Sequence, residues 1–247
     1  MPLTATPQPA LGYVTVDVSG LTGTIVVSRQ TPGGPATPVR NMDPVPAGTT
    51  AVNDRECPFG VPVTYTATYA TSSTATASTQ LDSTAARLEH PGLSTLGKWV
   101  QVISDTPPEW ESPSVVHKII GRADPIITAQ TLTARSGTLR LWCDTQAEVN
   151  EVIQLFQSGL PVLLRTPQPT LLRDGWLAAS RISDAHTAAD RQQRALEVQY
   201  QIAARPTGAA QGTQGWSWSA LTAANGTWGS LKTAYSTWSL AAAGPPA

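Results

Sequence analysis

Two carboxylates on either side of an aromatic ring form the pattern in this chain that comes nearest to a catalytic one. Glu109, Trp110 and Glu111 follow the segment Asp105-Thr-Pro-Pro. Glycosidases place two carboxylates at the scissile bond, and a hydrolase could use Glu109 and Glu111 in that way. An exposed loop stiffened by proline has the same composition, and we favour that interpretation. Trp110 remains a candidate contact for a glycan, because aromatic rings stack on sugars.

The three histidines give no metal-ligand spacing, since His90, His117 and His186 are far apart in the chain. His90 precedes Pro-Gly and is expected in a turn. His117 falls in an expected strand, and His186 falls in a polar connection. A Walker-type loop, a G-x-S-x-G elbow and a C-x-x-C pair are also missing from the sequence. We therefore expect no catalytic residues, no metal and no cofactor, and we expect that the protein is not an enzyme.

Composition narrows the classes of partner. Charged residues make up 13% of the chain and the net charge is −1, so no basic field for capturing nucleic acid is expected. Cys57 and Cys143 are expected to be free thiols. The chain begins without the basic and apolar segments of a signal peptide. It also lacks an apolar run of the roughly 18–20 residues that span a bilayer, so no membrane insertion is expected.

The last forty residues carry a tryptophan repeat with a ten-residue period. The frame W-x-x-L-x-x-A-x-x-T starts at Trp218 and at Trp228, and it begins again at Trp238. Such a segment is too apolar for a solvated linker and too short to fold alone. The expected interface residues are Trp216, Trp218, Leu221, Trp228, Leu231 and Trp238.

Three roles are open for the repeat. It could bind another subunit, because tryptophan is enriched among interface anchors. It could instead fold back over a sheet edge of its own chain, or its rings could stack on sugars. Thr227 and Thr237 directly precede a tryptophan, which favours short helical turns. Gly226 and Gly229 oppose one continuous helix.

Alternating apolar and polar residues predict a first β-sandwich over residues 11–89, after an N-terminal arm of residues 1–10. Val14, Val16 and Val18 alternate with polar neighbours, and so do the residues from Val63 to Tyr69. Turns rich in proline and glycine separate these short strands. Tyr65 is placed where a sandwich of this kind often has its corner tyrosine.

A second unit is expected over residues 99–206, after a linker of residues 90–98. Strands are expected at residues 99–103, 115–120, 139–143, 162–164, 176–182 and 196–202. They predict a mostly antiparallel sandwich with one helix laid against it. The Trp-repeat tail then occupies residues 207–247.

The helix of the second unit is expected over residues 145–158. Thr145 and Glu148 form a capping box, and Gly159 is a typical residue just past a helix C-terminus. An apolar stripe marks the face that should pack on the sheet. The stripe consists of Val149, Val152, Ile153 and Phe156.

The order of these parts resembles the minor tail proteins of siphophages that infect actinobacteria, and more loosely the distal tail proteins at the end of the tail tube. Residues 136–165 and the repeat at residues 226–238 carry most of the resemblance, and residues 52–65 add to it. It covers most of residues 11–240 and rests on pattern rather than on a diagnostic motif. It implies a mainly β fold with a fibronectin-type-III-like sandwich followed by a tail-tube-like sandwich.

The resemblance also implies a function. The chain would be a structural virion protein, a ring or adaptor subunit near the distal end of the tail, assembled in the host bacterial cytoplasm. It would form a homo-oligomeric ring, a hexamer or a trimer, and contact other tail proteins, with DNA only as passing cargo. The alternative is a carbohydrate-binding protein that recognises host cell-wall glycan through Trp110 and the tail.

Overall fold

The computed structural model describes most of the chain ahead of residue 207. The described residues are 3–18, 24–40, 42, 51–69, 74–92, 96–106, 109–110, 115–117, 126–128, 134–170, 172–186 and 193–206. This part of the chain is mainly β and contains one helix. The Trp-repeat tail and its six expected interface residues lie outside it, so the expectations made for them stay predictions.

The N-terminal half folds as a β-sandwich of two sheets. The strand order is β1-β2-β5 in one sheet and β4-β3-β6-β7 in the other. The strands are β1 (Thr4–Gln8), β2 (Tyr13–Asp17), β3 (Ile25–Gln30), β4 (Thr37–Pro38), β5 (Ala51–Asp54), β6 (Pro62–Tyr69) and β7 (Thr74–Gln80). The expected first sandwich is therefore confirmed as a sandwich.

The alternation in the sequence produces the core of this sandwich. Val14 and Val16 of β2 are fully buried, as are Tyr65 and Ala67 of β6. The residues between them face outward, because successive side chains of a strand point to opposite faces. Leu3 joins the same core. Residues 4–8, expected as a separate arm, pair with β2 as a strand of the sandwich.

The second half is a closed antiparallel barrel with the strand order β12-β15-β14-β13-β8-β9, where an open sandwich was expected. Closure depends on β8, which pairs with β13 on one side and with β9 on the other. The strands are β8 (Ala86–Glu89), β9 (Gly97–Asp105), β12 (Ser136–Cys143), β13 (Val162–Arg165), β14 (Gly175–His186) and β15 (Arg194–Ala203). The expected sandwich is therefore wrong for this unit.

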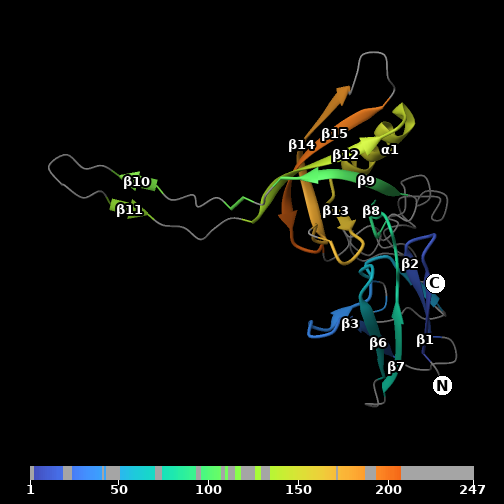
Figure 1. Ribbon diagram of the computed structural model, residues 1–247. Coiled ribbons are helices and arrows are strands. Elements are labelled where there is room, and N and C mark those ends of the chain that lie inside the picture. Colours follow the sequence, from blue (N-terminus) through green and yellow to red (C-terminus); the bar gives the residue numbers. More distant parts are fainter. Residues whose placement is uncertain are drawn as a thin grey trace, which may run out of the picture.

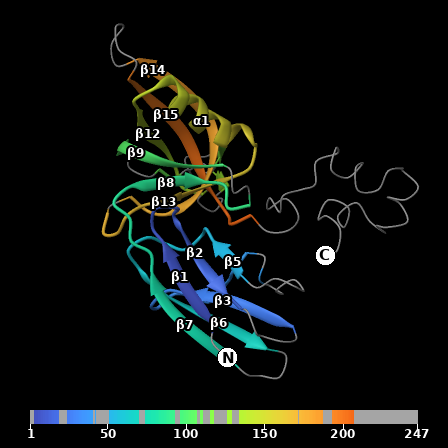
Figure 2. The same ribbon diagram turned by 90° about the vertical axis from the view of Figure 1, so that its right-hand side faces the viewer.

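The border between the two units also differs from the expected one. Strand β8 falls inside residues 11–89, which were assigned to the first sandwich, but its partners belong to the barrel. Strand β9 begins at Gly97, within the expected linker. The chain therefore passes from sandwich to barrel between β7 and β8, and the two units lie one above the other (Figure 1, Figure 2).

Helix α1 (Gln146–Gln157) confirms the expected helix and its N-cap Thr145, but the Glu148 carboxylate accepts from the backbone N–H of Asp144 instead of Thr145, so the reciprocal half of the capping box is shifted by one residue. The backbone N–H of Glu148 donates to Thr145 Oγ1 at 3.3 Å, and Gly159 adopts a φ of 71° just beyond the helix. Val149, Val152 and Leu155 are buried against the barrel core. Leu155 is an addition to the expected stripe, whose Ile153 and Phe156 are only partly buried. Within the described part of the chain, no helix is long and apolar enough to cross a membrane.

Strands β10 (Val115–His117) and β11 (Ile126–Thr128) form an antiparallel pair of their own. Figure 1 shows this pair well away from the barrel, and in the sequence it lies between β9 and β12. The sequence predicts a strand of the second sandwich at residues 115–120. A strand does form at Val115–His117, but it is not part of the barrel sheet.

Candidate functional site

The excursion between β9 and β12 begins as a continuation of the barrel sheet. We call residues 106–135 the arm. Beyond the last β9–β12 pairs, the N–H of Thr106 donates to the carbonyl of Thr138 at 3.0 Å. Glu109 and Ser136 then exchange two backbone hydrogen bonds, each of 3.0 Å. The root of the arm is therefore an antiparallel ribbon that grows out of the barrel wall.

The distant pair β10–β11 keeps nearly the register of this ribbon. Leu139 lies opposite Asp105 in the barrel, and His117 lies opposite Ile126 in the arm. From Glu109–Ser136 to His117–Ile126 one chain advances by eight residues and the other by ten, a difference of two. The two described pairs are therefore both antiparallel and similar in register.

A β-bulge interrupts the β9–β12 pair four residues before β12 reaches the arm's root at Ser136. The register between β9 and β12 shifts between Arg140 and Leu141, which leaves Ile103 without a partner opposite it. Bulges increase the local twist of a strand and redirect it. Ile103 is 47% exposed, one of the few large apolar side chains on the described surface.

Tyr200 of β15 fixes the arm's root from inside the barrel. Its hydroxyl donates to Asp105 Oδ1 at 2.8 Å and accepts from the Arg135 guanidinium at 3.4 Å. Burial, with the Asp105 charge, raises the pKa of Tyr200, so the hydroxyl keeps its proton at neutral pH. A side chain at Gly137 would meet the Tyr200 hydroxyl at 2.9 Å, so this close approach requires glycine.

A cluster of buried ion pairs lies where the sandwich meets the barrel, and we call it the domain junction. Its first centre is Glu89 of β8, whose side chain is 1% exposed. The carboxylate pairs with Arg165 of β13, with Arg87 at 3.1 Å and with Arg55 of the sandwich at 3.6 Å. One buried carboxylate of the barrel thus binds arginines from both units.

Arg165 carries this contact further into the sandwich. Its guanidinium donates to the carbonyl of Cys57 at 2.7 Å and to the carbonyl of Gly12 at 2.5 Å. It also lies over the ring of Phe59, 4.3 Å from the centroid, and Phe59 stacks on Trp99 of β9. Only a folded sandwich presents these two carbonyls and this ring together, so Arg165 joins the two units as folded bodies.

The second centre of the junction is Glu56, which follows β5. Its carboxylate pairs with Arg29 at 3.0 Å, with Arg40 at 2.5 Å and with Arg205 at 2.6 Å. Arg205 follows the last barrel strand and also donates to the carbonyl of Pro38 at 2.9 Å. Burial alone would raise the pKa of Glu56, but the charges of these arginines hold it below its ordinary value.

Asp54 completes the polar core of the sandwich next to this centre. It accepts hydrogen bonds from Arg29 at 2.6 Å and from the Tyr65 hydroxyl at 2.9 Å. The sequence placed Tyr65 at a sandwich corner, and its hydroxyl is satisfied here by a carboxylate. A buried charge without partners costs several kcal/mol, and these pairs offset part of that cost for Asp54.

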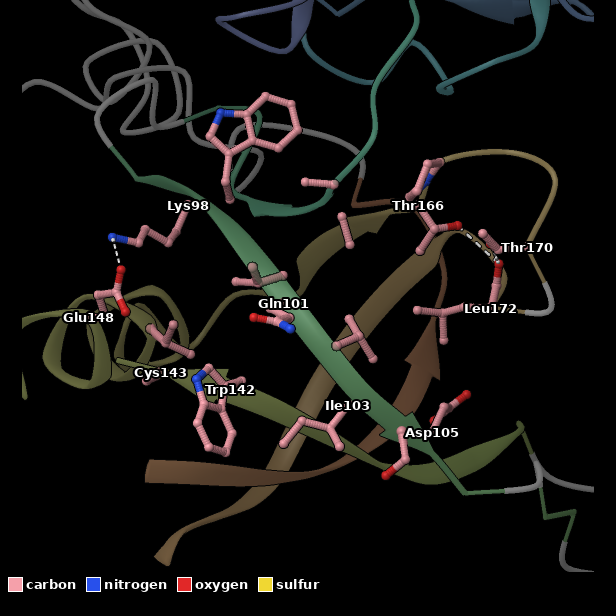
Figure 3. A pocket seen from close by; sticks show the side chains of 18 of the residues that line it. Lys98, Gln101, Ile103, Asp105, Trp142, Cys143, Glu148, Thr166, Thr170 and Leu172 are labelled. Atoms are coloured by element: carbon pink, nitrogen blue, oxygen red, sulfur yellow. Dashed lines mark hydrogen bonds and ion pairs between the residues drawn. The ribbon is translucent and has the colours of Figure 1, made fainter. Parts of the chain in front are cut away.

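A cleft of about 1050 Å³ runs along β9 next to the arm's root. Figure 3 shows Lys98 and Glu148 on one side of it, with Thr166 and Leu172 on the other. Lys98 pairs with Glu151 at 2.6 Å and with Glu148 at 3.6 Å. The hydroxyl of Thr166 donates to the carbonyl of Leu172 at 3.0 Å. The polar groups of the rim are therefore largely paired with one another.

Cys143 is the cysteine among the residues that line this cleft, and its surroundings disfavour the thiolate. Burial, with a contribution from Glu148, raises the pKa of Cys143 from 9.0 to about 11. Burial and the charge of Asp54 raise the pKa of Cys57, in the sandwich, to about 12. Both cysteines are free and buried, and a protonated buried thiol is a poor nucleophile.

The candidate residues from the sequence do not converge on one site. Trp110 is 55% exposed at the arm's root, and Glu109 beside it is held by backbone pairing with Ser136. Glu111 lies outside the described residues. His117 is exposed on the arm, and His90 is buried directly before the turn at residues 91–92. Among the described residues, no three side chains of the metal-ligating types gather around one point.

The junction residues could not be found from the sequence. Glu89 and Arg165 lie 76 positions apart in the chain, and nothing in the sequence of either strand indicates that these two residues pair. A weak signal existed in the charged residues of two short strands that are buried throughout, Ala86–Glu89 and Val162–Arg165. Charges in fully buried strands require partners. The sequence matches no protein-family model, and no curated protein is significantly similar to it.

Proposed function

We propose that this chain is a structural subunit of a phage tail, a ring or adaptor near the distal end of the tail tube. The observation that carries the proposal is the arm. A two-stranded ribbon alone is only marginally stable in water, so one that extends away from its own domain needs a partner surface. In an assembly that surface belongs to a neighbouring subunit or to another tail protein.

The junction supports the same proposal. A subunit that sets the position of the next ring needs its two units held rigidly against each other. Ion pairs between the sandwich and the barrel would hold them in this way. The strand orders 1-2-5 and 4-3-6-7 favour a fibronectin-type-III-like sandwich for the outer unit. The barrel with its single helix is the proposed tail-tube-like unit, which would surround the DNA channel without binding DNA.

The test is the mass and shape of particles of the full chain, compared with a chain that ends at Arg205. Light scattering and negative-stain imaging should show rings of three or six subunits, or oligomers that grow with concentration. Removal of the Trp-repeat tail should weaken them. A monomer at every concentration, with or without the tail, and without binding to other tail proteins, would refute the proposal.

Recognition of cell-wall glycan is the second candidate function, and the exposure of Trp110 favours it. An aromatic ring that is 55% exposed is available for stacking on a sugar. Binding to purified host cell walls should then be lost in Trp110→Ala and kept in Trp142→Ala, whose ring Nε1 donates to Asp144 at 2.9 Å. Equal binding by both variants would exclude Trp110 as the contact.

A further inference from the structure

Strand β9 changes its pairing partner halfway along its length. Residues 97–100 pair with β8, and residues 101–105 pair with β12. Among the described strands, the edge of β9 that faces β8 therefore has no strand partner at residues 101–105. Successive residues of an antiparallel strand direct their backbone N–H and C=O groups to opposite edges. Some of these groups thus point away from β12 without a partner strand, and we call residues 101–105 the open edge of β9.

The cleft along β9 lies in front of this open edge. Arg165 is the last residue of β13 that pairs with β8, and Thr166 and Leu172 follow it on the far side of the cleft (Figure 3). Exposed edges are often protected by lysine, proline or a bulge. The open edge contains neither lysine nor proline, and Ile103 is 47% exposed at its bulge. The bulge limits the length that can pair, so this edge can accept a short additional strand.

The arm carries a strand pair of matching size with open edges of its own. Strands β10 and β11 have three residues each and, among the described strands, pair only with each other. Figure 1 shows them well away from the barrel, so they do not fill the cleft of their own chain. A two-stranded ribbon gains stability when a third strand joins it. A second copy of this chain offers such a strand at its open edge.

The charges of the two surfaces favour the same match. The residues that line the cleft include three carboxylates and one lysine. Residues 115–128 of the arm include Lys118 and Arg122 against a single carboxylate, that of Asp124. Opposite net charges speed the encounter of two surfaces and suppress wrong partners. The rival occupant is the Trp-repeat tail, in which Lys232 is the only charged residue.

We propose that the open edge of β9 accepts the arm of a second copy of this chain, whose β10–β11 ribbon adds to it as a further strand. The inference rests on the proposed role of the arm in assembly. Main-chain hydrogen bonds give the affinity of such a strand addition, and the cleft beside the edge receives the side chains. Arm and edge are different surfaces of one chain, so the contact is head-to-tail. Contacts of this type close into rings when the rotation between subunits allows it.

Two variants of the full chain remove the two sides of this contact separately. Ile103→Lys blocks the edge, because a lysine on an edge strand opposes strand addition and repels the cations of the arm. Asn-Gly in place of residues 111–134 removes the arm. Each variant should sediment as a monomer under conditions in which the wild type assembles. Leu11→Lys is the matched control, since Leu11 is 51% exposed on the sandwich, and it should assemble as the wild type does.

An equimolar mixture of the two monomeric variants should restore one contact. The arm of Ile103→Lys then docks on the intact edge of the arm-shortened chain, and growth stops at a complex of one copy of each. An arm-shortened chain that also carries Ile103→Lys should give no complex. The absence of a complex in the first mixture would overturn the inference.

The single variants separate this inference from the proposed function. Wild-type assembly by Ile103→Lys, with the arm-shortened chain monomeric, would place the acceptor elsewhere and leave the proposed function intact. Wild-type assembly by the arm-shortened chain would overturn both.

A second measurement needs no substitution in the open edge. Hydrogen–deuterium exchange of the full chain at high and low protein concentration should show the peptides of residues 101–105 protected only in the assembled state. Peptides around Leu141 in the barrel core should not change. Protection that does not respond to dilution would contradict the proposal, even if Ile103→Lys failed to fold. Its loss in a chain that ends at Arg205 would then identify the Trp-repeat tail as the occupant.

Discussion

The guanidinium of Arg165 and the carboxylate of Glu89 form an ion pair in which both side chains are 1% exposed. The two residues lie on neighbouring barrel strands, yet the pair is completed by the sandwich through Arg55 and the carbonyls of Cys57 and Gly12. Burial holds the pKa of Arg165 below its ordinary value, and the charge of Glu89 opposes that shift. The sandwich thus supplies part of the set of partners that this buried pair requires.

Glu89→Gln should strongly destabilise the chain. It leaves Arg165, Arg87 and Arg55 without their shared carboxylate, and breaking a buried ion pair costs about 3–5 kcal/mol. Urea unfolding measures the loss. The matched control is Glu197→Gln, which breaks the exposed pair with Arg140 and should cost less than about 1 kcal/mol. Equal effects of the two substitutions would mean that Glu89 does not hold the junction.

Gly60→Ala should destabilise the chain more than Gly33→Ala does. Both glycines have a positive φ, so alanine is strained at either position. At Gly60 the new Cβ would also lie 3.0 Å from the carbonyl oxygen of Gln168, across the junction, whereas at Gly33 it would meet nothing within 4 Å. We expect about 1 kcal/mol at Gly33 and at least twice that at Gly60. Thermal unfolding of the two variants decides the order.

The buried thiols should make the protein less stable at alkaline pH. Burial raises the folded pKa of Cys57 to about 12 and of Cys143 to about 11. The unfolded chain therefore loses these protons first, and stability falls as the pH rises above about 9. The slope is at most about 1.4 kcal/mol per pH unit for each thiol. Unfolding between about pH 8 and 10 should show a smaller slope in Cys57→Ala/Cys143→Ala, and an equal slope would refute the assignment.

Tyr200→Phe should loosen the arm without unfolding the barrel. It removes the hydroxyl that binds Asp105 and Arg135 and keeps the buried ring. A lost hydrogen bond of this kind costs about 1–3 kcal/mol. Hydrogen exchange at Thr106, Glu109 and Ser136 should become faster than in the wild type. Unchanged exchange at the root would show that the β9–β12 ribbon alone directs the arm.

Local sequence signals predicted those parts of the fold that depend on neighbouring residues. Thr145, Glu148 and Gly159 identify the helix, because capping is decided within a few positions. The alternation at Val14 and Val16 likewise identifies a strand with one buried face. Both features follow from short-range geometry, and the structure contains both.

The contacts that join distant segments could not be predicted in this way. The sequence of Ala86–Glu89 is compatible with the last strand of a sandwich and with a strand that closes a barrel. Only the pairing of this strand with β9 and β13 distinguishes the two. The β-branched run at Val115 has the same composition in a barrel and in an arm. Trp110 was found as an aromatic candidate, but its place at the arm's root depends on the pairing of Glu109 with Ser136.

The most direct test of the account is an arm-shortened chain in which Asn-Gly replaces residues 111–134. This joins Trp110 to Arg135 by a two-residue hairpin turn and keeps the Glu109–Ser136 pair, so the barrel should fold as before. Sedimentation or light scattering should then show the full chain as an oligomer and the shortened chain as a folded monomer. Identical assemblies of both chains would contradict the claim that the arm is an assembly device.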